Sequence, residues 1–381
     1  MENLFFNKKI LVLKKKKKSF YYDLFIKGII QYGKPKKVFF VEYDSTSSIF
    51  ETNRKIKNLI FNENINIFIV TSFYFINPDL LYSIQGKVFR IKIDGDDVAL
   101  FNVYSKYYSK FYDLNITNTF EICKKFKKLG TNSFPYASPV FDNFSKKKKL
   151  NHKQNVIDVS FIGLIKNKRK HQVDFLKKKK INIKVFGDNK KTKFLSQNDY
   201  FETFKKSKIN LNFCSLTHDP KEIFIDEKKF NKLKNMSGRI FEVLSCKSFL
   251  LTEYNPSLEY FFKPGKDLEV FKNNDELFDK IKFYLSNKRA RDKISLHGFN
   301  TFMKKYEYQT YMPHFINSIS SFKGKELNGK KQKCPKLVKK FLTQKYISKN
   351  SLIDLDFYLL FIKYFDITYI VKKFFKKIIK I

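Results

Sequence analysis

The chain alternates strand-like apolar runs with segments of helical periodicity, and this alternation constrains its fold more than any other feature. In the first half such runs begin at Lys9, Val38, Ile65, Val88 and Leu114, with helical spacing or a turn signal between them. A repeated strand–helix unit is typical of a parallel sheet that is covered by helices on both faces. We therefore predict an α/β fold built on a doubly wound parallel sheet.

A polar stretch at residues 143–155 interrupts this alternation. It carries consecutive lysines at 146–149, which is typical of a linker between domains. The strand–helix alternation then begins again at Val156. We therefore predict two Rossmann-like domains, with a linker between them and a basic helical tail after them: residues 1–142, 143–155, 156–325 and 326–381.

The charge of the chain is strongly positive. Lys and Arg number 77 against 36 Asp and Glu, a net charge of +41, which favours contact with anionic surfaces or phosphorylated ligands. The sequence shows no zinc-ligand spacing, no aromatic RNA-binding motif and no helix-turn-helix signature. We therefore expect no specific nucleic-acid partner, and a basic nucleic-acid-binding protein stays open only as a third interpretation of the function.

The four cysteines are scattered without paired spacing, which predicts reduced thiols rather than disulfides or a metal site. No secretory signal and no apolar run long enough to cross a bilayer is visible, so we expect a cytoplasmic protein. Residues 369–381 have the pattern of a basic amphipathic helix. Two interpretations of this helix stay open: peripheral contact with anionic lipid on the inner face of the membrane, or packing on the protein itself.

A helix beginning near Gly238 carries one charged stripe on an otherwise apolar surface. Arg239 and Glu242 are three residues apart and share one face, while their neighbours are apolar. Such a stripe on a buried helix faces a cleft or a partner charge, although an ordinary surface salt bridge is the alternative. Residues 248–252 follow as a continuous apolar run, which predicts a parallel strand covered on both faces.

This stretch resembles the signature of the CgeB-like glycosyltransferases. The resemblance rests on Ser-Gly-Arg-Ile-Phe-Glu-Val-Leu-Ser-Cys at 237–246, Phe-Leu-Leu-Thr-Glu at 249–253 and Leu-Glu-Tyr-Phe-Phe-Lys-Pro-Gly-Lys at 258–266. It covers residues 156–315 well and the N-terminal half more loosely. It implies the GT-B fold, in which two Rossmann-like domains face a cleft. It also implies transfer of a sugar from a nucleotide-sugar donor to a glycan, lipid-linked or protein acceptor, with retention at the anomeric carbon and without a metal cofactor.

The predicted donor site combines the resemblance with the rule that ligands bind beyond the carboxyl ends of parallel strands. Gly163 follows a strand and lets backbone amides approach a ligand, and the cations Lys166 and Arg169 suit a diphosphate. A solvated, basic start of a helix is the alternative. The resemblance implies that Glu242 binds the donor ribose and that Arg239, with Gly238 before it, lies at the donor pocket.

An acidic turn, Asp94-Gly-Asp-Asp97, ends a strand of the first domain. Three interpretations stay open for Asp94, Asp96 and Asp97: a turn or helix cap, an acceptor contact, or a metal site. The sequence does not identify a catalytic base, and the catalytic residues stay unknown. The resemblance implies that the donor phosphate itself assists the reaction, so the lack of an obvious base does not argue against an enzyme. Lys234 occupies the position at which many retaining relatives carry a second Glu, and Lys247 replaces a family glycine. These departures keep open a non-catalytic binding protein on the same fold.

Overall fold

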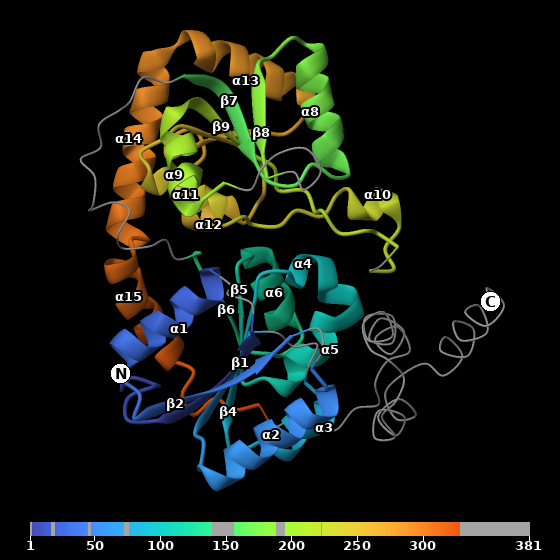
Figure 1. The fold of residues 1–381 in the computed structure, drawn as a ribbon, viewed down its shortest axis with the longest axis vertical. Coiled ribbons are helices and arrows are strands. Elements are labelled where there is room, and N and C mark those ends of the chain that lie inside the picture. Colours follow the sequence, from blue (N-terminus) through green and yellow to red (C-terminus); the bar gives the residue numbers. More distant parts are fainter. Residues whose placement is uncertain are drawn as a thin grey trace, which may run out of the picture.

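The computed structural model describes residues 2–16, 20–44, 47–71, 76–138, 156–187, 195–221 and 223–327. These residues form two lobes, each built on its own sheet, and the helices α14 and α15 connect them along one side (Figure 1). The predicted linker at 143–155 and all but the first two residues of the predicted tail lie outside the described residues.

The first lobe contains a six-stranded sheet in the order β2-β1-β3-β4-β5-β6, and every pair of neighbouring strands is parallel. The strands β3 and β4 are buried along their whole length, as their apolar runs predict. The elements are β1 (Lys9–Lys15), α1 (Phe20–Gly33), β2 (Lys37–Tyr43), α2 (Ile49–Asn62), β3 (Ile67–Val70), α3 (Pro78–Ser83), β4 (Phe89–Asp94), α4 (Asp97–Leu100), the π-helix η2 (Phe101–Ser105), α5 (Lys106–Tyr108), the 3-10 helix η3 (Ser109–Phe111), β5 (Leu114–Thr117), α6 (Phe120–Lys128) and β6 (Ser133–Pro135).

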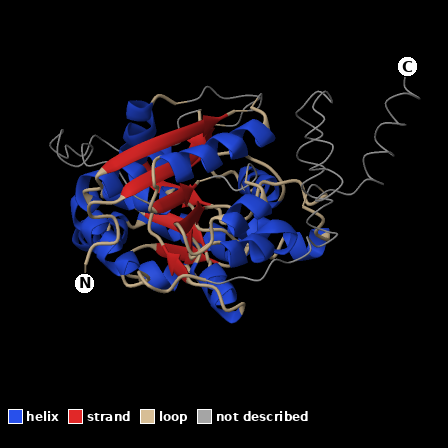
Figure 2. Cartoon of the chain, turned by 90° about the horizontal axis from the view of Figure 1, so that it is seen from below, coloured by secondary structure: helices blue, strands red, loops and turns tan. Residues whose placement is uncertain are grey.

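The second lobe contains a five-stranded parallel sheet in the order β11-β10-β9-β7-β8. When the molecule is viewed from below, with the first lobe in front, strands lie in the middle and helices lie around them (Figure 2). The elements are β7 (Ile157–Ile162), α8 (Lys168–Lys178), β8 (Ile183–Phe186), α9 (Gln197–Lys206), β9 (Ser207–Asn212), α10 (Glu227–Phe230), α11 (Arg239–Ser245), β10 (Leu250–Glu253), α12 (Leu258–Phe261), β11 (Glu269–Phe271), α13 (Asn274–Ser286), α14 (Lys288–Lys305) and α15 (Tyr308–Ser320).

Both sheets reverse their strand order next to their first strand. In the second lobe the chain passes from β7 to β8 on one side and then returns to place β9 on the other side of β7. Loops diverge at such a switch point, so the carboxyl ends of β7 and β9 are where this topology places a ligand.

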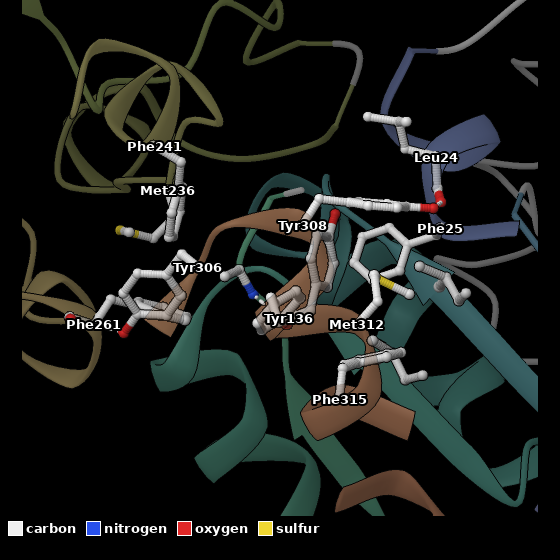
Figure 3. Close-up of a cluster of buried hydrophobic side chains, with 14 of the residues drawn as sticks. Leu24, Phe25, Tyr136, Met236, Phe241, Phe261, Tyr306, Tyr308, Met312 and Phe315 are labelled. Atoms are coloured by element: carbon white, nitrogen blue, oxygen red, sulfur yellow. Dashed lines mark hydrogen bonds between the residues drawn. The ribbon is translucent and has the colours of Figure 1, made fainter. Parts of the chain in front are cut away.

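The two lobes share a continuous apolar core. Phe241 and Phe261 of the second lobe pack around Tyr306, and α15 carries the core onward through Met312 to Phe25 of α1 (Figure 3). α15 thus lies against the first lobe although it follows the second in sequence, and the alternation of strands and helices gave no indication of this.

The junction of the lobes is also hydrogen-bonded. The Asn235 side chain donates to the Gly95 carbonyl oxygen at 2.7 Å, and the Asn118 side chain donates to the Met236 carbonyl oxygen at 2.9 Å. Gly95 and Asn118 follow the carboxyl ends of β4 and β5. The ends of the first sheet therefore meet the segment that leads into α11.

The predicted fold class is confirmed: both sheets are parallel and form α/β lobes. The numerical limits of the two domains stay a prediction. The loop at residues 217–235 contains the short helix α10. Of the helices in the described ranges, none combines the length and apolarity needed to cross a membrane.

Candidate functional site

Gly163 occupies the switch point of the second sheet, directly after β7. Its φ of 150° belongs to a region that L side chains rarely adopt. A Cβ atom at this position would lie 2.9 Å from Nη2 of Arg239. The glycine therefore lets a guanidinium from α11 lie against the backbone of the β7–α8 loop.

Arg239 reaches this position from the first turn of α11. Its Nη1 donates to Oδ1 of Asn212, at the end of β9, at 2.9 Å. Its guanidinium carbon lies 5.4 Å from the centroid of the Phe161 ring. The Nε atom is buried and has no hydrogen-bond partner among the described residues. These contacts fix the side chain and leave one buried donor available to a ligand.

Arg169 lies beside Arg239 and comes from the first turn of α8. Its Nε and Nη2 donate to the Ser215 carbonyl oxygen at 2.9 and 2.5 Å. Burial, together with the positive charge of Arg239, lowers the pKa of Arg169 to about 10. Within the described ranges neither guanidinium forms a salt bridge. The Glu253 carboxylate acts on Arg169 from beyond salt-bridge distance. Two like charges without a salt-bridge partner in the described ranges form a site suited to an anion.

Glu242 lies inside the second lobe, one turn along α11 from Arg239. Glu242 is 3% exposed. Its Oε2 accepts a hydrogen bond of 2.5 Å from the hydroxyl of Tyr200, on α9. Burial and the Glu242 carboxylate raise the pKa of Tyr200 well above its ordinary value, so the phenol keeps its proton. Tyr200 therefore orients the carboxylate that was predicted to bind ribose.

The other two predicted donor residues lie close to this group. Gly238 is the residue before the first turn of α11. Lys166 lies in the β7–α8 loop with an exposed side chain, which forms no hydrogen bond or ion pair with described residues. The structure thus brings together Gly163, Arg169 and Arg239, places Gly238 and Glu242 on the same helix start, and leaves Lys166 in solvent.

A buried carboxylate that the sequence did not single out supports this site. Glu253 ends β10 and accepts hydrogen bonds of 3.1 Å from the backbone amides of Cys214 and Ser215. Lys168 and Lys234 lie 2.8 and 3.4 Å from its Oε1. Although burial acts to raise the pKa of Glu253, the two lysines hold it below its ordinary value. Lys234, noted as a departure from the family pattern, is thus the partner of a buried acid.

The acidic turn after β4 contains three carboxylates in different environments. Asp97 is buried and accepts a hydrogen bond of 2.5 Å from Lys92, which supports a structural role. Asp96 is exposed. Asp94 is 4% exposed, and its Oδ1 accepts from the Asp96 amide at 2.8 Å. Its Oδ2 is buried without a hydrogen-bond partner among the described residues.

The turn lies at the lobe junction, because Gly95 carries the carbonyl oxygen that accepts from Asn235. Among the described residues no group of three or more His, Cys, Asp or Glu side chains is arranged to hold a metal ion. The predicted independence of metal stays a prediction.

Replacing Asp94 with asparagine is expected to stabilise the protein increasingly as the pH rises. Burial and the neighbouring Asp97 raise the pKa of Asp94 well above its ordinary value. In the folded chain Asp94 therefore keeps a proton that it loses in the unfolded chain above about pH 3.9. As a result, the free energy of unfolding of the wild type falls by up to about 1.4 kcal/mol per pH unit, until the pH passes the pKa of Asp94 in the folded chain. Asparagine does not titrate. Urea unfolding at about pH 4 and about pH 7 measures the difference.

An Asp94→Asn effect of the same size at both pH values would contradict a raised pKa.

Comparisons with known proteins agree with this geometry. Residues 168–317 match the model of a family described as glycosyl transferase-like. No curated protein sequence matches the chain. Among solved structures, sucrose-phosphate synthase from Thermosynechococcus elongatus is similar, with 8% identity over 83% of this chain and 99% of that chain and a TM-score of 0.54.

Two further structures are similar to the chain. HepE from Anabaena, in complex with UDP and glucose, shows 10% identity over 82% of this chain and all (100%) of that chain, with a TM-score of 0.57. The apo form of WaaB, a lipopolysaccharide outer core galactosyltransferase, shows 10% identity over 82% of this chain and 99% of that chain, with a TM-score of 0.54. The two parallel sheets therefore form the GT-B fold that the resemblance implied. The match over 168–317 includes Arg169, Arg239 and α11, and it begins after Gly163 and Lys166.

Proposed function

We propose that the protein is a glycosyltransferase that uses a nucleotide-sugar donor. The observation that carries this proposal is the position of Arg239 against Gly163, at the switch point of a GT-B second lobe, with the positive charge of Arg169 acting on it. Neither arginine forms a salt bridge with a described residue. Two guanidiniums beside a glycine suit the diphosphate of such a donor. Glu242, held by Tyr200, is proposed to accept hydrogen bonds from the ribose hydroxyls.

Truncating Arg239 to alanine is expected to weaken UDP binding about 10- to 100-fold. A hydrogen bond to a charged group contributes about 1.5–3 kcal/mol, and each 1.4 kcal/mol corresponds to a factor of ten in Kd. Isothermal titration calorimetry with UDP measures the change. Arg169→Ala should weaken UDP binding to a similar degree.

Lys170→Ala is the matched control, since Lys170 is an exposed cation next to Arg169 on α8. UDP binding that is equal in the Arg239→Ala variant and in this control would overturn the assignment of the diphosphate site.

The finer features of the reaction rest on the resemblance to the CgeB-like group, which we propose as the subfamily. We propose transfer to a glycan, lipid-linked or protein acceptor with retention at the anomeric carbon and without a metal. Asp94 is proposed as an acceptor contact because it is buried at the lobe junction with one oxygen atom unpartnered. The proposed location is the cytoplasm, and the proposed membrane contact of the tail concerns residues outside the described ranges.

A non-catalytic binding protein is the second candidate, and Lys234 favours it. This lysine stands where many retaining relatives have an acid. Its side chain forms an ion pair with Glu253 and donates a hydrogen bond of 2.7 Å to the Tyr254 carbonyl oxygen. Hydrolysis of UDP-glucose by the purified protein separates the candidates. Release of UDP supports the enzyme, whereas binding of UDP-glucose without any release of UDP supports the binding protein.

A further inference from the structure

A separate cavity of about 650 Å³ lies between the start of α8 and the 217–235 loop. Its volume is within the range of ligand pockets in proteins, which is about 300–1,000 Å³. Its lining includes Lys168 and His171 of α8 and the loop residues Asp219, Lys221 and Glu227. Neither Arg169 nor Arg239 lines it, so the cavity is distinct from the proposed diphosphate site.

The walls of this cavity are fixed by contacts with both lobes. Asn167 has a φ of 52° and donates through its side chain to the carbonyl oxygens of Leu216 and His218 at 3.4 and 2.9 Å, which holds the loop against α8. Ile223 and Phe230 of the loop are buried in the apolar core of the first lobe. Lys168 is held by the buried Glu253. The cavity is therefore a supported feature of the fold rather than a gap under an unsupported loop.

The charge of the lining selects the class of ligand. Lys168 and Lys221 are balanced by Asp219 and Glu227, in a chain whose net charge is +41. A phosphorylated ligand would need an excess of cations, as at the arginine pair. Balanced donors and acceptors instead suit a neutral molecule with many hydroxyl groups.

The polar groups around the cavity are available for such a ligand. The side chains of His171, Lys221, Glu227 and Asn231 form no hydrogen bonds with described residues. Ile225 and Phe230 add apolar surface, against which the C–H groups of a sugar ring can pack.

The position of the cavity places it next to the donor site. Arg169 donates to the Ser215 carbonyl oxygen, whereas Asn167, two residues earlier, donates to the next carbonyl oxygen along the loop. The start of α8 therefore connects the two places, because Asn167 and Lys168 line the cavity and the next residue, Arg169, belongs to the arginine pair.

We propose that this cavity binds a neutral saccharide as the acceptor, an inference that rests on the proposed function. In the transfer, an acceptor hydroxyl oxygen forms a bond to the anomeric carbon of the donor sugar. The bond from that carbon to the diphosphate oxygen breaks, and the hydroxyl proton passes to the released nucleoside diphosphate. The cavity would hold the acceptor's sugar rings beside the donor during this exchange.

The test is calorimetry of the full chain with maltose, lactose and chitobiose as probes, in the presence of UDP. At least one disaccharide is expected to bind the wild type, and Glu227→Ala is expected to weaken that binding about tenfold. UDP affinity should stay unchanged in this variant, which also shows that it is folded. Asp292→Ala, which removes an exposed acid of α14, is the matched control.

Failure of all three disaccharides to bind, or equal binding by Glu227→Ala and the control, would overturn the acceptor cavity. The two proposals fail separately. Disaccharide binding that depends on Glu227, without UDP binding, would overturn the proposed donor but leave the saccharide site. UDP binding that depends on Arg239, without disaccharide binding, would do the reverse.

Discussion

Replacing Asp113 with alanine is expected to lower the free energy of unfolding by about 3–5 kcal/mol, because it leaves a buried guanidinium without its counter-ion. Arg90 and Asp113 have fully buried side chains. Nε and Nη2 of Arg90 donate to the two carboxylate oxygens of Asp113 at 2.9 and 2.7 Å. The carboxylate also accepts from the backbone amides of Arg90 and Leu327, at 2.7 and 2.8 Å.

The four hydrogen bonds join β4, the residue before β5 and the segment after α15. Loss of this acid therefore also removes one of the hydrogen bonds that hold the chain where it returns to the first lobe. Urea unfolding, followed by circular dichroism, measures the change in free energy.

Two further variants make this prediction specific. Asp292→Ala breaks an ion pair with Lys288 whose side chains are 75% and 59% exposed, and it should cost less than about 1 kcal/mol. The double variant Arg90→Met with Asp113→Leu removes both charges and should recover part of the loss. A cost for Asp113→Ala no larger than that of the exposed pair would show that the buried charge is not the cause.

The sequence predicted the strands well because most of them are covered on both faces. The apolar runs at 65–70 and 88–93 correspond to β3 and β4, in which every residue is buried. Helix ends were also predictable where a polar cap was local. Asn77, followed by Pro78, has the sequence pattern of a helix start, and its side chain accepts a hydrogen bond from the Asp79 amide at 2.9 Å. The place of α15 was not predictable, because its packing on α1 joins residues almost 300 positions apart, as in the Tyr308–Leu24 contact.

The candidate site was predictable only where a ligand-facing residue follows a strand or begins a helix. Gly163, Arg169 and Arg239 satisfy this condition, and the structure brings them together. The sequence analysis did not identify Tyr200 and Glu253, because their side-chain partners are distant in the sequence. Tyr200 binds Glu242, and Glu253 pairs with Lys234, which is 19 residues away. A tyrosine in an aromatic-rich helix and an acid after an apolar run carry no local signal of such partners.

Gly298→Ala is expected to destabilise the protein by about 3 kcal/mol or more, although alanine is the better helix former by about 1 kcal/mol. Gly298 lies inside α14, where this helix crosses α11. An added Cβ atom would lie 2.0 Å from the Asp267 carbonyl oxygen and 2.8 Å from Cδ2 of Leu244. The carbonyl belongs to the backbone, so it cannot give way as a side chain can. The free-energy cost of this steric clash therefore exceeds the gain from the higher helix propensity of alanine.

Gly28→Ala provides the matched comparison, because it also adds a methyl group at a helix–helix contact. There the three nearest atoms are Cε, Cγ and Sδ of Met312, at 2.3, 2.9 and 3.0 Å, and all belong to one flexible side chain that can change its rotamer. Its cost should stay below about 1 kcal/mol, since the propensity gain offsets the shift of the methionine. Thermal unfolding of both variants measures the contrast. Equal losses would show that the backbone at Asp267 moves away from α14 as easily as the Met312 side chain changes its rotamer.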